Sequence, residues 1–321
     1  MRQNAIIQRC DDYGILSRCL LITPEPVSDE VLQYVHYNSY ISKIARTEEM
    51  CDNDRKEFAK TMDSVYFNQH SALAARLAVG SLIQALELVH RGDVRNAFCL
   101  TRFHVLTIYA RFFSPPGHHA MEDEACGFSL FNNVAVAAYY ALDKLDYNRV
   151  LILDWDVHHG QGTQYSFYNS SQVLYISIHR YENQQFWPHL RESNFDFVGA
   201  GRGRGFNINI PLNESKLTDA DYLAIFHRLI LPIAFEFDPD LILVSAGYDC
   251  AYGCPLGQME VSPPLFAHLT HKLMCLAEGK LVMALEGGYY ADSLAESVAH
   301  TISALLGDPM PSLEPIAEIK P

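Results

Sequence analysis

Short apolar runs alternate with longer amphipathic segments over the second half of the chain. The runs are rich in Val, Ile and Leu, as are strands that a sheet buries on both faces. The segments between them have the length and the apolar spacing of helices. This alternation predicts an α/β fold of three layers, with a mostly parallel sheet and helices on both of its faces. The predicted strands are Val150–Leu153, Val173–Ile178, Phe206–Ile210, Leu241–Val244 and Leu281–Leu285.

The first third of the chain is predicted to be mainly helical. Ala72–His90 has periodic apolar residues, and Gly92 follows it as a typical helix stop. We find no internal repeat, so we expect a single domain over residues 1–321 with a loose, Pro-rich tail at 310–321. Three further helices are predicted at Asp219–Phe237, Ser262–Ala277 and Ala291–Leu306.

Residues that can carry chemistry follow three of the predicted strands. Asp154, Asp156 and His158 come directly after the first of the five. Asp249 follows the fourth, and Gly287–Tyr289 follows the fifth. In open α/β sheets, ligands bind outside the carboxyl ends of the strands. We therefore expect these residues to meet at one edge of the sheet.

The segment after the first of these strands predicts a metal site. In an extended backbone Asp156 and His158 point to the same side, so both can bind one ion. Asp249 supplies a third ligand from another strand. Carboxylate and imidazole ligands with an open position are typical of catalytic zinc rather than structural zinc. The alternative is a surface acidic turn with structural histidines, which so dense a set of ligand groups disfavours.

Two adjacent imidazoles, His118 and His119, follow a stiff Pro115–Gly117 turn. A metal-activated water needs a proton acceptor, and imidazole suits that task near neutral pH. A carboxylate such as Asp154 can orient one of the two rings and raise its basicity. A His-His pair alone is often structural, and the metal site elsewhere in the chain is what favours a catalytic pair.

Aromatic residues on loops complete the candidate site. Tyr289 follows two glycines, which allow the backbone to turn its phenol into a crevice. A phenol there can donate to the oxyanion that forms when water attacks an amide. Gly127–Phe128 and Phe186–Pro188 can wall a narrow channel for an aliphatic chain. Taken singly, these are an ordinary strand-to-helix turn and ordinary core aromatics.

Composition narrows the class of protein further. The net charge is −14, which argues against direct nucleic-acid binding and is compatible with cationic substrates or simply with solubility. No apolar stretch reaches the roughly 18 residues of a membrane span, and the start lacks a signal-peptide core. The eight cysteines include no C-x-x-C pair, so we expect reduced thiols in a cytoplasmic or nuclear protein.

Five motifs in this order resemble those of the zinc-dependent histone deacetylases, and the resemblance runs from about Arg18 to Pro309. Three further stretches, His159–Gly162, Trp187–Ser193 and Pro255–Met259, are similar to class IIb, nearest its polyamine-deacetylase member. The five motifs are Pro115–His119, Gly127–Phe128, Asp154–Gly160, Ala246–Asp249 and Glu286–Tyr289.

The resemblance implies an arginase-like α/β fold and assigns a role to each site residue. His119 would be the general base and acid, with His118 as its electrostatic partner. Tyr289 would polarise the acetyl carbonyl beside the zinc. The remaining implied roles are zinc binding by Asp156, His158 and Asp249; support of the histidines by Asp154 and Gln161; an acyl tunnel lined by Gly127, Phe128 and Trp187; and structural potassium held by Asp154, Asp156, His158, Ser177 and Ile178.

The chain departs from the family pattern in four places. Met1 falls inside the first family helix, so the preceding strand and pocket-rim loop are expected to be missing. Phe103–Ser114 interrupts the run from Arg102 to the Pro-Pro-Gly turn, and we interpret it as a retained intron or gene-model error. Leu256 stands where the polyamine-selective member has a gate glutamate. Cys254 replaces an aspartate that is common in this loop.

The sequence therefore predicts a deacetylase of N-acetyl-lysine in histones or other proteins. Leu256 favours that substrate, whereas Gln161, Trp187 and Arg191–Ser193 favour acetylpolyamines such as N8-acetylspermidine. An arginase-like ureohydrolase with two metal ions is disfavoured by the His-His pair and the Gly-Gly-Tyr turn. An inactive scaffold that binds acetylated tails or partners is the remaining alternative.

Overall fold

The computed structural model describes residues 2–100 and 116–313, so Phe103–Ser114 and its interpretation lie outside the described residues. Six parallel strands form one sheet in the order β1-β6-β5-β2-β3-β4. This parallel sheet was the main expectation from the apolar runs, and it is confirmed. The strands are β1 (Asn96–Cys99), β2 (Val150–Asp154), β3 (Val173–Arg180), β4 (Asn207–Leu212), β5 (Leu241–Ala246) and β6 (Leu281–Leu285).

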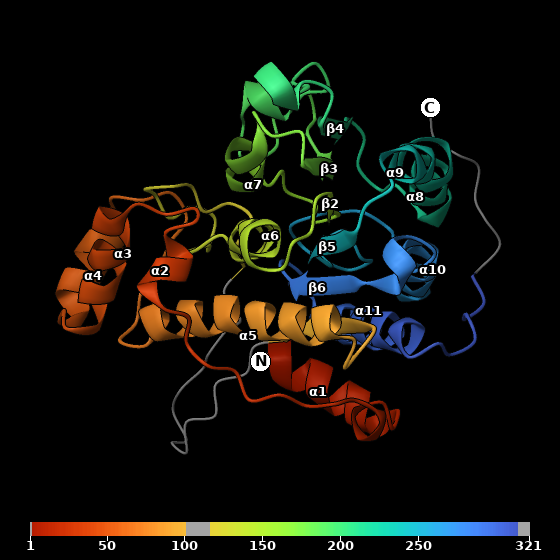
Figure 1. The fold of residues 1–321 in the computed structure, drawn as a ribbon, viewed down its shortest axis with the longest axis horizontal. Helices are drawn as coiled ribbons and strands as arrows, with labels where there is room; N and C mark the ends of the chain where they lie inside the picture. The colour runs from red at the N-terminus through yellow and green to blue at the C-terminus, as the bar shows by residue number, and fades with distance from the viewer. Residues whose placement is uncertain (1, 101–115, 314–321) are drawn as a thin grey trace.

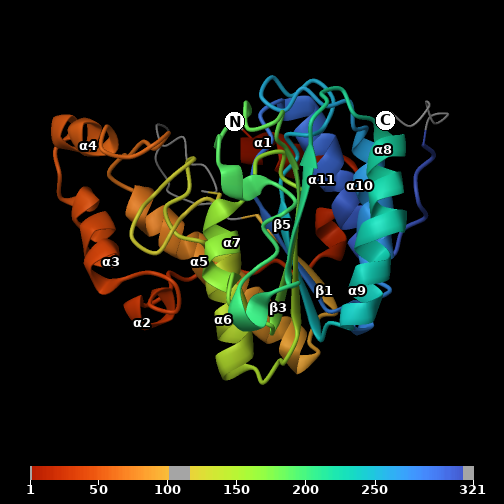
Figure 2. The ribbon, with the colours of Figure 1, turned by 90° about the horizontal axis from the view of Figure 1, so that it is seen from above.

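Helices cover both faces of the sheet (Figures 1 and 2). Seen from above, α3 and α5–α7 lie on one side of the strands and α8–α11 on the other (Figure 2). The helices are α1 (Arg2–Asp12), α2 (Asp29–Leu32), α3 (Asn38–Ala45), α4 (Asp52–Ala59), α5 (Ser71–Arg91), α6 (Asn133–Lys144), α7 (Gln161–Phe167), α8 (Asp219–Ile225), α9 (Leu231–Phe237), α10 (Pro263–Leu273) and α11 (Ala291–Leu305).

The two faces of the sheet pack into two separate cores, because successive side chains of a strand point to opposite faces. Leu151 and Leu153 of β2 lie in the core that includes α1, α8, α10 and α11. Val150 and Ile152 lie in the core that includes α3, α5 and α6. All four side chains are fully buried, so the predicted arrangement of three layers is confirmed.

Most predicted helices match the structure. α5 ends at Arg91, and Gly92 adopts the left-handed conformation (φ +76°) of a helix stop. α8 and α9 form one run joined by a π-helical turn, Phe226–Ile230. α5 is also the one described helix long and apolar enough to cross a membrane, but 67% of its most apolar window is buried, as in a core helix.

Residues 310–313, the described part of the predicted loose tail, contact the domain. The carbonyl of Pro311 accepts a hydrogen bond from Nε2 of His268 on α10 at 2.8 Å. Leu313 packs against the core on that side of the sheet. Residues 310–313 are therefore attached to the domain, and residues 314–321 lie outside the described part of the chain.

Candidate metal centre

Three neighbouring strands bring the candidate residues to one edge of the sheet. β2, β5 and β6 are adjacent and parallel, and Asp154 is in register with Ser245 of β5, which is in register with Ala284 of β6. The loops that follow these strands therefore begin at the same level. As predicted, they meet at the carboxyl edge of the sheet.

Asp156, His158 and Asp249 form a group that can hold one metal ion, with ligand atoms within 4.8 Å of one another. Nδ1 of His158 lies 3.1 Å from Oδ1 of Asp156 and 3.1 Å from Oδ2 of Asp249. Backbone N–H groups fix both carboxylates: Val157 donates to Asp249 at 2.8 Å, and Gly287 donates to Asp156 at 2.8 Å. The ligand atoms are thus held in place by the backbone of two loops.

The charge balance of this group favours a cation. Both carboxylates are almost completely buried, and burying two negative charges together is costly unless a positive charge compensates them. Burial, followed by the negative charge of Asp156, raises the pKa of Asp249 to about 6. Two carboxylates and one imidazole form the donor set of a catalytic zinc site with an open position. The residues present therefore fit zinc.

His118 is held as a cation by the carboxylates around it. Its Nδ1 donates to Oδ2 of Asp154 at 2.9 Å, and the same carboxylate oxygen accepts from the hydroxyl of Tyr175 at 2.9 Å. Burial opposes protonation of His118, but the negative charges of Asp154 and Asp156 raise its pKa to about 10. The ring is therefore positively charged at neutral pH.

His119 is held as a neutral ring in one tautomer. Oε1 of Gln161 lies 2.7 Å from its Nδ1, and because an amide oxygen only accepts, Nδ1 carries the proton. The amide of Gln161 is oriented in turn by a 3.5 Å contact from Nε2 to the sulfur of Cys126. Burial and the positive charges of His118 and His158 lower the pKa of His119 well below its usual range. Nε2 of His119 is left with a lone pair that can take a proton.

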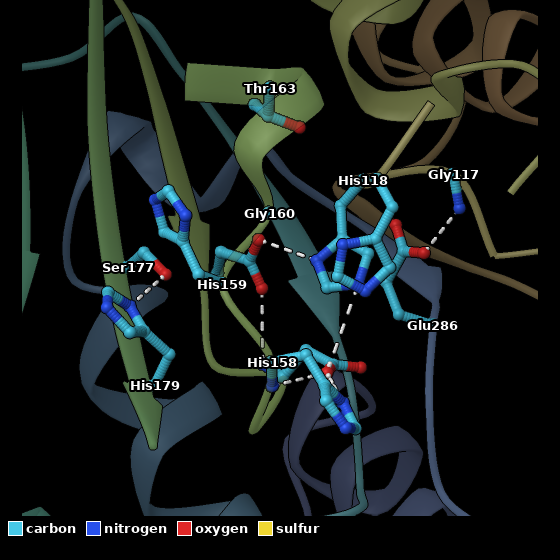
Figure 3. Close-up of polar contacts among 12 residues, drawn as sticks. Gly117, His118, His158, His159, Gly160, Thr163, Ser177, His179 and Glu286 are labelled. Atoms are coloured by element: carbon cyan, nitrogen blue, oxygen red, sulfur yellow. Dashed lines mark hydrogen bonds and ion pairs between the residues drawn. The ribbon is translucent and has the colours of Figure 1, made fainter. Parts of the chain in front are cut away.

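Glu286 is a site residue that sequence reasoning did not single out. Its Oε2 accepts a hydrogen bond from the backbone N–H of Gly117 at 2.6 Å, next to His118 (Figure 3). The carboxyl is fully buried, and Oε1 has no hydrogen-bond partner among the described residues. Its place directly before the Gly-Gly-Tyr turn was visible in the sequence, but nothing there indicated its partner. Glu286 links that turn to the loop of the two histidines.

Tyr289 lies beside the metal group with its phenol protonated. Burial, together with the negative charges of Asp249 and Asp156, raises the pKa of Tyr289 well above its usual value. The guanidinium of Arg2 lies over the ring at 5.3 Å, and it also donates to the carbonyl of Glu286 at 2.6 Å. Tyr289 is thus available as a hydrogen-bond donor.

Aromatic rings wall the approach to the histidines. Trp187 packs edge-on against His119 with ring centroids 4.6 Å apart, and Phe128 lies 6.3 Å from Tyr289. Gly127 sits between the walls with φ +52°, and a Cβ there would lie 2.5 Å from both His119 and Trp187. Only glycine fits this position. The predicted lining residues Gly127, Phe128 and Trp187 are therefore together.

The rim of this wall includes an exposed residue that the sequence did not indicate. Asp63 accepts a hydrogen bond from Nε1 of Trp187 at 2.9 Å and, through its backbone carbonyl, one from the N–H of Gly127 at 3.1 Å. An acidic residue in a helical third of the chain carries no pattern that predicts such a contact. Asp63 thus holds Trp187 and Gly127 next to each other.

Leu256, the predicted gate residue, is 44% exposed on the loop between β5 and α10. The neighbouring carbonyl of Gly257 accepts a hydrogen bond from Arg180 at 3.0 Å. The guanidinium of Arg180 also lies 4.4 Å from the centre of the Phe186 ring. The loop of Leu256 is thus attached to the same aromatic wall, although no described contact joins Leu256 itself to the other lining residues.

The residues predicted to hold potassium lie at the ends of β2 and β3. Asp154 is in register with Ser177, and both are fully buried, as is Ile178. The N–H of Asp156 donates to Oδ1 of Asp154 at 3.2 Å, and the hydroxyl of Ser177 is bonded to Nδ1 of His179 at 2.9 Å. These positions are compatible with the prediction, which remains a prediction.

Fold and site together define the chain as an α/β protein with a buried carboxylate–imidazole group that can hold a metal ion at the carboxyl edge of a parallel sheet. The family model for the Histone deacetylase domain matches residues 1–305. A solved structure described as the HDA15 HD domain is similar over 97% of this chain and 82% of its own, with 37% identity and a TM-score of 0.86. The chain belongs to the histone deacetylase family.

Several curated relatives share the domain. Polyamine deacetylase HDAC10 of Homo sapiens is 46% identical over 97% of this chain and 45% of its own length, and that of Danio rerio is 45% identical over 94% and 43%. Histone deacetylase clr3 of Schizosaccharomyces pombe is 43% identical over 89% of this chain and 40% of its own. This chain thus spans less than half the length of these relatives.

Proposed function

We propose that the chain is a zinc-dependent amide hydrolase that removes acetyl groups from N-acetyl-lysine in histones or other proteins. The observation that carries the proposal is the metal group flanked by one cationic and one neutral imidazole. Membership of the histone deacetylase family supports the reaction, and the buried carboxylates of Asp156 and Asp249 support the metal.

The residues divide the chemistry among themselves. Zinc held by Asp156, His158 and Asp249 would supply Lewis acidity toward the acetyl carbonyl and the attacking water. His119, neutral and protonated at Nδ1, accepts the proton of the water at Nε2 and later gives it to the leaving amine. His118 stays cationic beside Asp154 and compensates the negative charge that develops. Tyr289 donates its phenolic proton as a hydrogen bond to the carbonyl oxygen.

The aromatic wall suits an aliphatic acyl-amine chain. Gly127, Phe128 and Trp187 contact the lysine side chain along its methylene groups, while the backbone of the protein substrate stays at the rim. Leu256 presents no charge at that rim, so a second cationic amine in the substrate gains no attraction there. This absence of charge is what favours lysine over a polyamine.

A second candidate substrate is an acetylpolyamine such as N8-acetylspermidine. The relatives named polyamine deacetylases are 45–46% identical to this chain, and that likeness favours the candidate. Leu256 in place of an acidic gate disfavours it. The third candidate, an inactive scaffold for acetylated tails, predicts zinc binding without turnover.

Two further assignments belong to the proposal. Potassium would be held by Asp154, Asp156, His158, Ser177 and Ile178, at the ends of β2 and β3 where Asp154 and Ser177 pair in register. Cytoplasmic or nuclear residence is proposed because all eight cysteines are free, five of them buried.

The test compares acetate release from an acetyl-lysine peptide and from N8-acetylspermidine under one condition. We expect a higher kcat/KM for the peptide. A preference for the polyamine would contradict the lysine assignment, and zinc binding without release from either substrate would support the scaffold instead. A version lacking Phe103–Ser114 belongs in the comparison, and a transcript that encodes the segment throughout would contradict its interpretation as an intron.

A further inference from the structure

The loop between β3 and β4, residues 181–206, carries Phe186 and Trp187 against the metal group. Phe186 stacks on the ring of His158 with centroids 5.2 Å apart and an interplanar angle of 19°. Trp187 packs edge-on against His119 at 4.6 Å. Apart from two single 3-10 turns the loop has no regular structure. Near the rings its backbone bonds are local turns, from Phe186 to Tyr181 at 3.1 Å and from His189 to Phe186 at 2.9 Å, and they leave the back of the loop to be held by other groups.

Four side chains outside the loop bind four backbone carbonyls at its back. We call these side chains, Gln164, His179, Asn207 and Asn209, the polar clamp. Three of the carbonyls belong to Glu192, Ser193 and Asn194, and the fourth to Phe197. The bonds run from Gln164 to Glu192 at 2.9 Å, from His179 to Ser193 at 2.7 Å, from Asn209 to Glu192 and Asn194 at 3.0 and 3.2 Å, and from Asn207 to Phe197 at 2.8 Å.

The chemistry of the acceptors fixes the orientation of the clamp. Backbone carbonyls only accept hydrogen bonds, so the atoms that face them are donors: the amide Nε2 of Gln164, the amide Nδ2 of both asparagines and the Nε2–H of His179. Oε1 of Gln164 accepts from Asn207 and Asn209 at 2.9 and 2.8 Å, which joins three of the clamp side chains. Oδ1 of both asparagines has no hydrogen-bond partner among the described residues, so each serves as a donor.

The clamp is also attached to the segment that carries the metal ligands. His159, which follows the ligand His158, donates from Nε2 to Oε1 of Gln164 at 3.1 Å. Its Nδ1 accepts from the hydroxyl of Ser193 in the loop at 2.8 Å. His159 and His179 lie side by side with ring centroids 4.6 Å apart, and the hydroxyl of Ser177 completes the chain (Figure 3).

Because the clamp side chains are buried, losing one of their hydrogen bonds costs free energy of folding. Gln164, His159 and His179 are fully buried, and Asn207 and Asn209 are 3% and 4% exposed. The bond to Ser193 is buried and the other four are partly buried, so a carbonyl that loses its donor must do without a partner or move toward water. The back of the loop therefore has one favoured position relative to His158.

We propose that the polar clamp positions Trp187 and Phe186 and thereby sets the width of the acyl-amine channel. Its members are positioning residues, since they act through the two aromatic rings. The proposal rests on the proposed deacetylase function for its effect on substrate. The effect of the clamp on the position of Trp187 does not depend on that function, because it can be observed directly by fluorescence.

The experiment uses the whole chain loaded with zinc and the variants His179→Leu and Asn209→Leu, which remove the donors and keep side chains of similar shape. Trp187 reports on the loop, because Trp155, the second of the two tryptophans, is fully buried and shielded from acrylamide. We expect a red-shifted emission, stronger acrylamide quenching, and a rise in KM of about tenfold with kcat changed less than about threefold. Zinc content is expected to stay at the wild-type value.

Two controls separate positioning from general stability. Thr270→Val removes a fully buried hydrogen bond within α10, far from the loop in sequence, and is expected to lower the melting temperature without any change in quenching or KM. His179→Gln keeps an N–H donor toward Ser193 and is expected to restore much of the wild-type quenching. If either leucine variant fails to fold, Ser193→Ala removes only the bond to His159 and is expected to give a smaller shift in the same direction.

The proposal would be overturned if the leucine variants lose stability but keep wild-type quenching and wild-type KM. Where the leucine variants do not fold, the same result in Ser193→Ala would overturn it. If the unsubstituted protein releases acetate from neither substrate, the proposed function fails on its own. The emission and quenching of Trp187 then still decide whether the clamp holds the loop.

Discussion

The carboxylate of Glu286 binds the backbone N–H of Gly117 at 2.6 Å across 169 positions of sequence, and so joins the turn that carries Tyr289 to the loop that carries both histidines. The same turn donates the N–H of Gly287 to the metal ligand Asp156. One short segment after β6 therefore fixes the proposed base, the proposed metal ligand and the proposed oxyanion donor relative to one another. The predictions that follow depend on this arrangement.

Replacing Glu286 tests the link itself. Glu286→Leu leaves the N–H of Gly117 buried without an acceptor, which costs about 1–3 kcal/mol of unfolding free energy, and frees the histidine loop. We expect kcat to fall at least about tenfold, as a loss of positioning at the reacting centre. Glu286→Gln keeps an acceptor for Gly117 and is expected to retain more activity. Equal loss of kcat in the two variants would show that the hydrogen bond does not matter.

The stability of the protein should carry a pH dependence from the same carboxyl. Burial raises the pKa of Glu286 to about 7 from its usual value of 4.5. Between these values the folded protein holds more protons than the unfolded chain, so stability falls as pH rises through this window and levels off above about pH 7. Urea unfolding from pH 4.5 to 8 measures it. Between pH 4.5 and pH 8 the parent should lose more unfolding free energy than Glu286→Gln, which has no carboxyl to titrate. Parallel profiles of unfolding free energy for both proteins would contradict the assignment.

The pH dependence of activity should reflect the two histidines. His119 has a pKa well below its usual range, so it stays neutral and competent as a base through neutral pH, and its protonation sets the acid limb of activity. His118 stays cationic until its pKa of about 10. Asp154→Asn removes a negative charge beside His118, lowers its pKa and should move the alkaline limb of kcat/KM to lower pH. An unmoved alkaline limb would contradict the role of His118.

Gly127 allows a sharp steric test. Gly127→Ala places a Cβ 2.5 Å from both His119 and Trp187, so we expect kcat/KM to fall about 100-fold through displacement of the base and the wall. Gly14→Ala is the matched control, because Gly14 also has positive φ (+67°) but has no atom within 4 Å of the new Cβ. That control should lose stability alone. A similar loss of activity in both would attribute the effect to backbone strain.

Substrate preference is expected to follow the charge at position 256. Leu256→Glu places a carboxylate at the rim and should raise kcat/KM for N8-acetylspermidine by up to about fivefold relative to the acetyl-lysine peptide, since an exposed charge pair is worth at most about 1 kcal/mol. Leu256→Gln introduces a side chain of the same size as glutamate but without its charge. It should leave the ratio of the two kcat/KM values near that of the parent. An unchanged ratio in Leu256→Glu would place the gate elsewhere.

The sequence predicted those features that have a local pattern, namely the apolar runs of strands and the reactive residues directly after them. The apolar runs predicted five of the six strands, and the residues after β2, β5 and β6 meet because parallel strands end at one edge. The contacts of Glu286 and Asp63 were not predicted, because their partners, a backbone N–H and an indole N–H, lie far away in sequence and carry no local signal. The polar clamp was not predicted for the same reason, since its acceptors are backbone carbonyls. The attachment of residues 310–313 depends on His268, which a Pro-rich composition does not predict.

Zinc-dependent acetate release tests the account most directly. Protein stripped of metal by a chelator would be assayed on an acetyl-lysine peptide before and after addition of one equivalent of zinc, with Tyr289→Phe alongside. The account predicts no release without metal, recovery with zinc, and release slowed about 100-fold in Tyr289→Phe at full zinc content. Release that is independent of zinc, or no release from a fully loaded protein, would contradict it.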